Sequence, residues 1–237
     1  MSKMENRQPV AVLTGATSGI GSAVACNLGR QGYRLVVITR QRVVPSYLRH
    51  YTHDVLHADL SQPEEVDTLL PFLREMVPQV DVLVHAAGVF SGTSVSSTPV
   101  EELDVLYRVH LRSAFQLVQA LLPALEAAAG QIVFINTTAV AAPRPNLSCY
   151  AATKNALRAF ADALRLEVNS RHIRVLSVFP GRTHTAMQEQ IFRQEKREYQ
   201  PDRLIQPEDV AESVCHSLAL PRTVELTDVW LRPMQAI

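Results

Sequence analysis

Tyr150 and Lys154 lie four residues apart at the start of a long helical pattern, CYAATKNALRAFADALRLEV. Residues at this spacing are neighbours on one face of a helix. A lysine ammonium beside a tyrosine favours the phenolate, which lowers the phenol pKa from about 10 towards neutrality. Tyr150 is therefore a candidate general acid or base. Isolated pairs of this kind also occur on ordinary helix surfaces, so the hypothesis needs support from the rest of the chain.

A glycine-rich segment near the N-terminus is typical of a nucleotide-binding loop. TGATSGIG, residues 14–21, follows a short apolar run and leads directly into a helical pattern. Its glycines can provide a tight turn and a close backbone approach to a phosphate, which the helix N-terminus favours. The alternative is a turn needed only for packing. The predicted cofactor contacts here are Gly15, Thr17, Ser18, Gly19, Ile20 and Gly21.

The end of the second apolar run, VVITRQR, favours NADP(H) over NAD(H). An acidic residue in this region would accept the ribose hydroxyls of NAD, but Thr39 stands there and is followed by Arg40 and Arg42. Guanidinium groups suit a 2′-phosphate because they form charge-assisted, often bidentate, hydrogen bonds. The alternative is that both arginines are solvated ends of a loop.

Short apolar runs alternate with longer helical patterns along the whole chain, which predicts βαβ units and a parallel sheet. We expect an α/β fold with one doubly wound domain over residues 1–237. The segment QRVVPSYLRHYTHD is too short for a full crossover helix. The polar segment around residues 184–206 follows a strand end, which favours a lid over a site.

Composition narrows the function classes. The 237 residues are 47% hydrophobic, and 23 Lys and Arg balance 23 Asp and Glu, so no overall field would recruit nucleic acid or an anionic membrane. The three cysteines are widely spaced, which indicates reduced thiols in the cytosol. The polar N-terminus and the lack of a long apolar run lead us to expect a cytoplasmic protein. We place His50 and His53 in a loop and His57 in a strand, and we expect no metal site at these three residues.

Four motifs, in this order and with these separations, resemble the short-chain dehydrogenase/reductase family: TGATSGIG, HAAG, YAATK and FPGRTHT. The resemblance covers essentially the whole chain. It implies a Rossmann-type domain, an NAD(P) cofactor, and hydride transfer to or from a carbonyl or alcohol. It also implies that Tyr150 is the acid/base and that Lys154 lowers its pKa and holds the nicotinamide ribose. The further cofactor contacts that it implies are Asp59 at the adenine, Thr183 and Thr185 at the carboxamide, and Leu60, Ala87, Gly88, Pro180 and Gly181.

Two positions depart from the family pattern. The serine that orients the substrate oxygen is replaced by Thr137, which keeps the hydroxyl but adds a methyl group and a stiffer χ1. Alternation along a strand end should point the adjacent Thr138 elsewhere. The asparagine that normally kinks the long helix is replaced by His110. Either His110 titrates in a proton relay, or it fills space while a backbone carbonyl holds the water, or proton delivery is impaired. His85 also replaces an asparagine, and we expect it to bind neighbouring backbone.

These observations favour an NADPH-dependent reductase of a small carbonyl compound, or the reverse reaction. The competing hypothesis is a cofactor-binding sensor or scaffold that retains the fold without efficient catalysis. The apolar faces of helical patterns 100–128 and 149–170, together with the family resemblance, predict a homodimer or homotetramer. The substrate stays open at this stage, and Arg182 either meets a carboxylate or caps a strand end.

Overall fold

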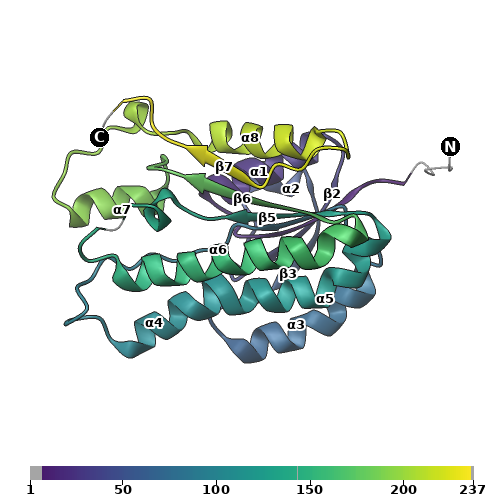
Figure 1. Cartoon of the computed structure of the whole chain (residues 1–237), viewed down its shortest axis with the longest axis horizontal. Helices are drawn as coiled ribbons and strands as arrows, with labels where there is room; N and C mark the ends of the chain where they lie inside the picture. The colour runs from purple at the N-terminus through teal and green to yellow at the C-terminus, as the bar shows by residue number, and fades with distance from the viewer. Residues whose placement is uncertain (1–6, 143, 236–237) are drawn as a thin grey trace.

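The computed structural model describes residues 7–142 and 144–235, and within these ranges seven strands form one parallel sheet (Figure 1). The strand order β3-β2-β1-β4-β5-β6-β7 is that of a doubly wound Rossmann-type domain, as predicted. The order reverses between β1 and β4, and the crevice at such a point is the expected ligand site in this fold. The strands are β1 (Val10–Thr14), β2 (Arg34–Thr39), β3 (Thr52–His57), β4 (Val82–His85), β5 (Gln131–Ile135), β6 (Arg174–Pro180) and β7 (Asp228–Leu231).

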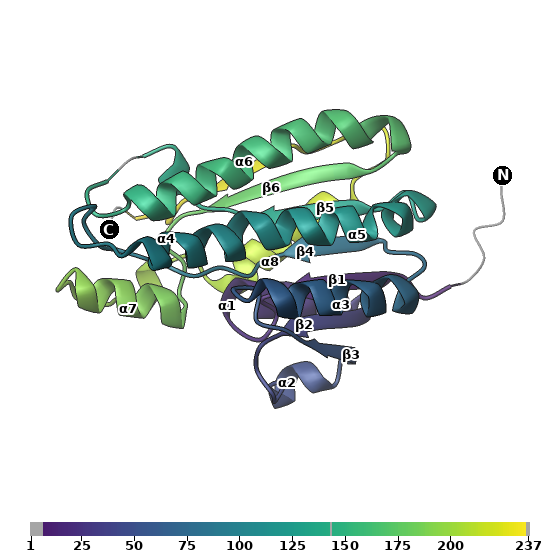
Figure 2. The same ribbon diagram turned by 90° about the horizontal axis from the view of Figure 1, so that it is seen from below.

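Helices cover both faces of the sheet (Figures 1 and 2). Successive strand residues alternate between two buried clusters, so that Val12 packs with the α3, α5 and α6 side and Leu13 with the α1 and α8 side. Strands that are buried on both faces explain the continuous apolar runs in the sequence. The helices are α1 (Gly19–Arg30), α2 (Ser46–Arg49), α3 (Pro63–Met76), α4 (Val100–Tyr107), α5 (Ser113–Ala127), α6 (Ser148–Val168), α7 (Ala186–Gln194) and α8 (Pro207–Ala219).

The sequence predicted one of two irregular features of the fold, the connection between β2 and β3. The crossover between β2 and β3 contains only the short helix α2, beside the β3 edge of the sheet (Figure 2). The long helical pattern from Val100 is divided by a π-helical segment, Arg108–Arg112, that contains His110. The placement of His53 was wrong, because this residue lies within β3 and not in a loop. In the described part of the chain, no helix combines the length and apolar character that a membrane crossing requires.

Candidate active site

A pocket of about 730 Å³ opens at the carboxyl ends of the strands. Segments that follow β1, β4, β5, β6 and β7 form its walls together with the start of α6 and with α7. Most of the predicted site residues line it: Gly15, Ser18, Gly19, Ile20, Gly21, Gly88, Thr137, Tyr150, Lys154, Pro180, Gly181, Thr183 and Thr185. The predicted residues that lie outside its lining are Thr17, Arg40, Asp59, Leu60, Ala87 and His110.

The glycine loop is packed so closely that side chains have no room. Gly15 has a φ of +67°, and a Cβ there would lie 2.6 Å from the backbone of Ala86 after β4. A Cβ at Gly21 would overlap the carbonyl of Gly15. The N-cap of α1, Ser18, makes no side-chain capping hydrogen bond, so the first N–H groups of α1 remain available at the pocket wall. These features fit the phosphates of a dinucleotide.

Arg40 and Asp59 lie together beyond β2 and β3. An Arg40 Nη lies 3.8 Å from an Asp59 carboxylate oxygen, and the arginine side chain is 69% exposed. Asp59 also accepts a hydrogen bond from the Ser61 N–H at 2.9 Å. Of the other predicted contacts, Leu60 is buried in the core and the Ala87 N–H donates to the Thr14 hydroxyl at 3.2 Å. Arg40 is thus exposed and positioned for a ligand that extends past β2.

Tyr150 lies in the first turn of α6, with its half-buried ring in the pocket wall. The ring centroid is 5.2 Å from that of Phe90 and 5.6 Å from that of His110. Burial raises the pKa of Tyr150 to about 12, and the hydrogen bond with the Thr137 side chain opposes this rise. The expectation that Lys154 lowers this pKa is therefore wrong for this structure, because desolvation of the phenolate outweighs the stabilising contacts.

Lys154 is buried one turn further along α6, with 4% of the residue exposed. Its Nζ donates to the carbonyl of Ile135, the last residue of β5, at 3.0 Å. Burial lowers the pKa of Lys154 to about 8. Asn136, which sequence reasoning missed, donates from its Nδ2 to the Lys154 carbonyl at 3.1 Å and fixes α6 against the end of β5.

His110 connects two segments of the active site. Its Nδ1 is 2.9 Å from the Thr153 hydroxyl, which in turn donates to the Tyr150 carbonyl at 3.0 Å. In one tautomer Nε2 accepts from the Val89 N–H at 3.2 Å, and in the other it donates to the Val89 carbonyl at 3.0 Å. Burial, with a smaller effect from Lys154, lowers the pKa of His110 to about 2. Titration near neutrality is thus contradicted, and His110 is neutral and holds the Tyr150 helix to the chain after β4.

His85, at the end of β4, is completely enclosed. Its Nδ1 lies 3.1 Å from the Thr14 hydroxyl and its Nε2 lies 3.1 Å from the Val109 carbonyl. Burial, together with the charge of Lys154, lowers the pKa of His85 to about 3. The expectation that it binds neighbouring backbone is confirmed, and a neutral imidazole here fastens β4 to the π-helical segment. Across the described residues, no group of three or more His, Cys, Asp and Glu side chains is placed to hold a metal ion.

Arg182 meets a carboxylate, and that carboxylate belongs to this chain. One of its terminal nitrogens, Nη2, lies 2.8 Å from both carboxylate oxygens of Glu195, just beyond α7. The guanidinium also stands over the Phe192 ring, 4.7 Å from its centroid. These contacts bring the expected lid segment against the pocket. Pocket-lining residues that the sequence did not reveal include Phe90, Arg144 and Arg232.

Comparison with known proteins agrees with this geometry. Residues 9–196 match the family model described as short chain dehydrogenase. An uncharacterised short-chain type dehydrogenase/reductase of Sinorhizobium fredii is 34% identical over 235 residues, covering 96% of this chain and 92% of that protein. Among solved structures, an alcohol dehydrogenase of the archaeon Thermococcus sibiricus, complexed with 5-hydroxy-NADP, has a TM-score of 0.83 at 26% identity, covering 96% of this chain and 97% of that one.

A second solved structure extends the comparison. The 3-ketoacyl-(acyl-carrier-protein) reductase from Brucella melitensis, complexed with NADH, has a TM-score of 0.80 at 25% identity and covers 94% of this chain and 96% of that one. The family match spans more than half of the sequence and includes the glycine loop, Tyr150 and Lys154. From the fold, the pocket and these similarities together, we conclude that this chain belongs to the short-chain dehydrogenase/reductase family of oxidoreductases, whose members generally use a nicotinamide cofactor.

Proposed function

We propose that the protein is an NADPH-dependent reductase that converts a carbonyl to an alcohol, or catalyses the reverse. The observation that carries this proposal is the group formed by Thr137, Tyr150 and Lys154. Thr137 hydrogen-bonds Tyr150, and all three residues line the same pocket as the glycine loop. A proton donor, its partner hydroxyl and a buried cation therefore border one pocket.

The residues divide the chemistry as follows. The bound reduced nicotinamide supplies the hydride. The Thr137 hydroxyl donates a hydrogen bond to the substrate carbonyl oxygen, and Tyr150 gives its proton to the same oxygen as negative charge develops there. A phenol with a pKa of about 12 is protonated at neutral pH and is ready to donate. Lys154, with a pKa of about 8, is mostly charged at neutral pH, and we assign its ammonium to the hydroxyls of the nicotinamide ribose.

Preference for NADPH is supported by Arg40. Its exposed guanidinium lies beyond β2, on the side of the sheet where the glycine loop follows β1. The ion pair with Asp59 orients the arginine, and a 2′-phosphate is a stronger partner than a neutral ribose hydroxyl. The similar solved structures include proteins with NADP-type and with NADH ligands, so the preference is argued from this chain's own residues.

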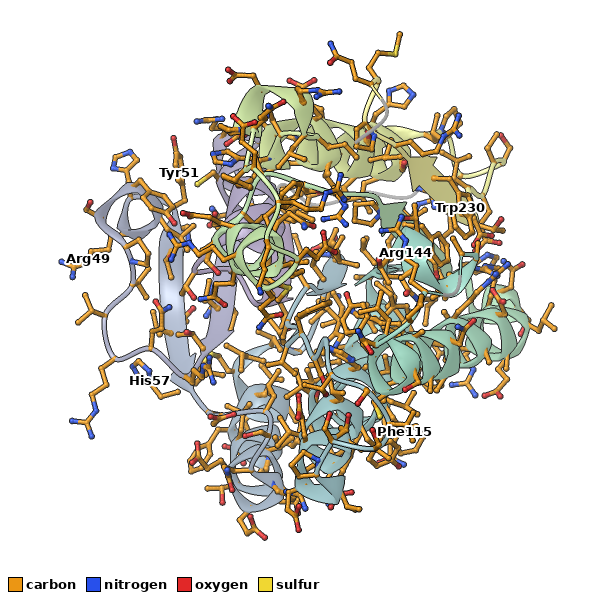
Figure 3. The ribbon with its side chains drawn as sticks, turned by 90° about the vertical axis from the view of Figure 1, so that its left-hand side faces the viewer. Arg49, Tyr51, His57, Phe115, Arg144 and Trp230 are labelled. Atoms are coloured by element: carbon orange, nitrogen blue, oxygen red, sulfur yellow. The ribbon has the colours of Figure 1, made fainter. Side chains whose placement is uncertain are left out.

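Two further features complete the proposal. Helix α7 and residues around 184–206 act as a lid, supported by the contact between Arg182 and Glu195 across the pocket. Large apolar side chains on α4, α5 and α6 remain exposed and favour a homodimer or homotetramer. They are Leu103, Tyr107, Phe115 and Leu166 (Figure 3 labels Phe115). Light scattering at several protein concentrations would measure the subunit number.

The decisive test of the proposed reaction is Tyr150→Phe. This change keeps the ring and removes the transferable proton, so we expect turnover to fall by about 100-fold to 10,000-fold, with NADPH affinity nearly unchanged. The measurement is NADPH consumption with a panel of aldehydes, ketones, quinones and β-keto esters. Tyr107→Phe, on the exposed face of α4, is the matched control.

Full activity in Tyr150→Phe would remove the assignment of Tyr150 as proton donor. Tight NADPH binding without turnover of any carbonyl in the wild type would instead favour the cofactor-binding sensor or scaffold. That alternative draws its support from the replacement of the family's usual side chains by His110 and Thr137.

A further inference from the structure

Three arginines gather at one side of the pocket. Arg144 lies between β5 and α6, Arg182 lies two residues after the end of β6, and Arg232 directly follows β7. These three strands are neighbours in the sheet, whereas the glycine loop follows β1. Figure 3 shows Arg144 and Trp230 of β7 on one side of the molecule and Arg49 of α2 on the other. The arginines therefore lie on the opposite side of the pocket from the loop that fits the cofactor phosphates.

The charges in this pocket are unbalanced. Among the described residues that line it, the cations are Arg144, Lys154, Arg182 and Arg232, and Glu195 is the single acid. Neither Arg144 nor Arg232 has a hydrogen bond or an ion pair within residues 7–142 and 144–235. A concave surface lined by one sign of charge concentrates ligands of the opposite sign. The β5–β7 side of the pocket is thus suited to an anion.

Arg182 uses only part of its hydrogen-bonding capacity. Both oxygens of Glu195 contact the same terminal nitrogen, Nη2, at 2.8 Å. The other terminal nitrogen, Nη1, is buried and has no hydrogen-bond partner. A guanidinium binds a carboxylate most favourably through two parallel hydrogen bonds, one from each of two nitrogens. Glu195 therefore occupies Arg182 without the paired geometry that a free carboxylate can adopt once Glu195 moves aside.

We propose that the substrate is an oxo acid, a molecule that carries a carboxylate in addition to the reacting carbonyl. The proposal rests on the reductase function proposed above. The substrate carboxylate displaces Glu195 and then binds Arg182. The positive charges of Arg144 and Arg232 attract this carboxylate into the pocket. Phe90, Met187 and Ile191 also line the pocket and provide apolar contacts for a hydrocarbon chain between the carboxylate and the carbonyl at Tyr150.

The test compares acids with their neutral esters. Pyruvate, acetoacetate, levulinate and 5-oxohexanoate, each beside its methyl ester, are assayed for NADPH consumption. We expect kcat/KM for at least one acid to exceed that for its ester about tenfold or more, since the acid alone gains charge-assisted hydrogen bonds. Arg232→Gln and Arg182→Gln should reduce this preference about tenfold, and Arg171→Gln, which is exposed beyond α6 and outside the pocket lining, should preserve it.

The variant Arg232→Gln tests the proposal without disturbing the packing of the lid. Arg182 packs on Phe192, so Arg182→Gln also disturbs the lid, whereas Arg232 is exposed and unpaired within the described residues. Glu195→Gln should have the opposite effect to the arginine variants. It frees Arg182 from its ion pair and should raise kcat/KM for the acid several-fold. Equal or faster reduction of the esters, with no effect of Arg232→Gln, would overturn the oxo-acid proposal and leave the reductase intact.

Calorimetry separates this proposal from the reaction itself. The same acids and esters are titrated into protein saturated with NADP⁺, where no reduction occurs. Binding of an acid but not of its ester, with the loss of that binding in Arg232→Gln, supports the anion site even if no carbonyl is turned over. In that case the reductase proposal alone fails. Absence of both binding and turnover for every acid would reject the oxo-acid proposal.

Discussion

Glycines and main-chain atoms form the pocket wall that follows β1 and β4, whereas long side chains form much of the wall that follows β5, β6 and β7. On the first side, Gly15 and Gly21 stand so close to neighbouring backbone that only glycine fits. On the second side, Arg144 and Arg232 are exposed and unpaired within the described residues. The first wall suits a ligand whose shape does not vary. In the second wall, the exposed side chains can be substituted without a change of fold.

The largest expected effect tests the rigidity of the glycine wall. Gly21→Ala places a methyl group against the Gly15 carbonyl, and we expect a loss of about 3 kcal/mol in the free energy of unfolding together with weaker NADPH binding. Gly88→Ala is the matched control, because its Cβ would lie 3.6 Å from His110 Nε2 and 3.8 Å from Lys154 Nζ, which are ordinary contacts. Urea denaturation measures the free energy of unfolding of both variants. Equal stability of the two variants would refute the difference in packing.

A second effect concerns the buried histidines between the two walls. The native pKa values of His85 and His110, about 3 and about 2, lie below the unfolded value of about 6.5. The unfolded state therefore binds more protons at acid pH, and stability falls as the pH drops below about 6.5, by up to about 1.4 kcal/mol per pH unit for each histidine.

His110→Asn removes one of these two groups. We expect the slope of unfolding free energy against pH, between about pH 5 and about pH 6, to be smaller in this variant. The decrease should be up to about 1.4 kcal/mol per pH unit, which is the contribution of one proton. Urea denaturation at a series of pH values measures the slope. His172→Asn is a control at an exposed position between α6 and β6. An unchanged slope in His110→Asn would contradict the neutral, buried state of this imidazole.

The smallest expected effect concerns the preference for NADPH over NADH. Arg40→Ala should weaken NADPH binding about tenfold through loss of a charge-assisted hydrogen bond, and change NADH binding little. Fluorescence titration of both cofactors measures the ratio. Arg49→Ala, on the nearby helix α2, controls for a general loss of positive charge. An equal loss for both cofactors would argue against a 2′-phosphate contact.

The sequence revealed the features that depend on local spacing. Gly15, Gly21 and the pair Tyr150 and Lys154 belong to short segments whose geometry follows from a strand-to-helix turn or from one helical turn. The doubly wound sheet followed from the alternation of apolar runs and helical patterns, and its strand order agrees with the family resemblance.

Features that depend on tertiary burial were not predictable in the same way. The raised pKa of Tyr150 reflects the exclusion of water by segments distant in the chain. The neighbourhood of Arg144, Arg182 and Arg232 arises because three strand ends meet at one edge of the sheet. The pairing of Arg182 with Glu195 depends on how α7 folds back, which no local pattern specifies.

The π-helical segment Arg108–Arg112 also sets the rotational phase of the helix that follows it. Each residue of an α-helix turns the chain by about 100°. A π-helix takes more residues per turn than an α-helix, so converting this segment to regular α-helix with no change in chain length would rotate the buried row of α5 relative to α4 and away from the sheet. This row comprises Leu117, Leu121 and Leu125. The π-helical geometry at this point therefore determines which face of α5 meets the sheet, while His110 within it holds the helix that carries Tyr150.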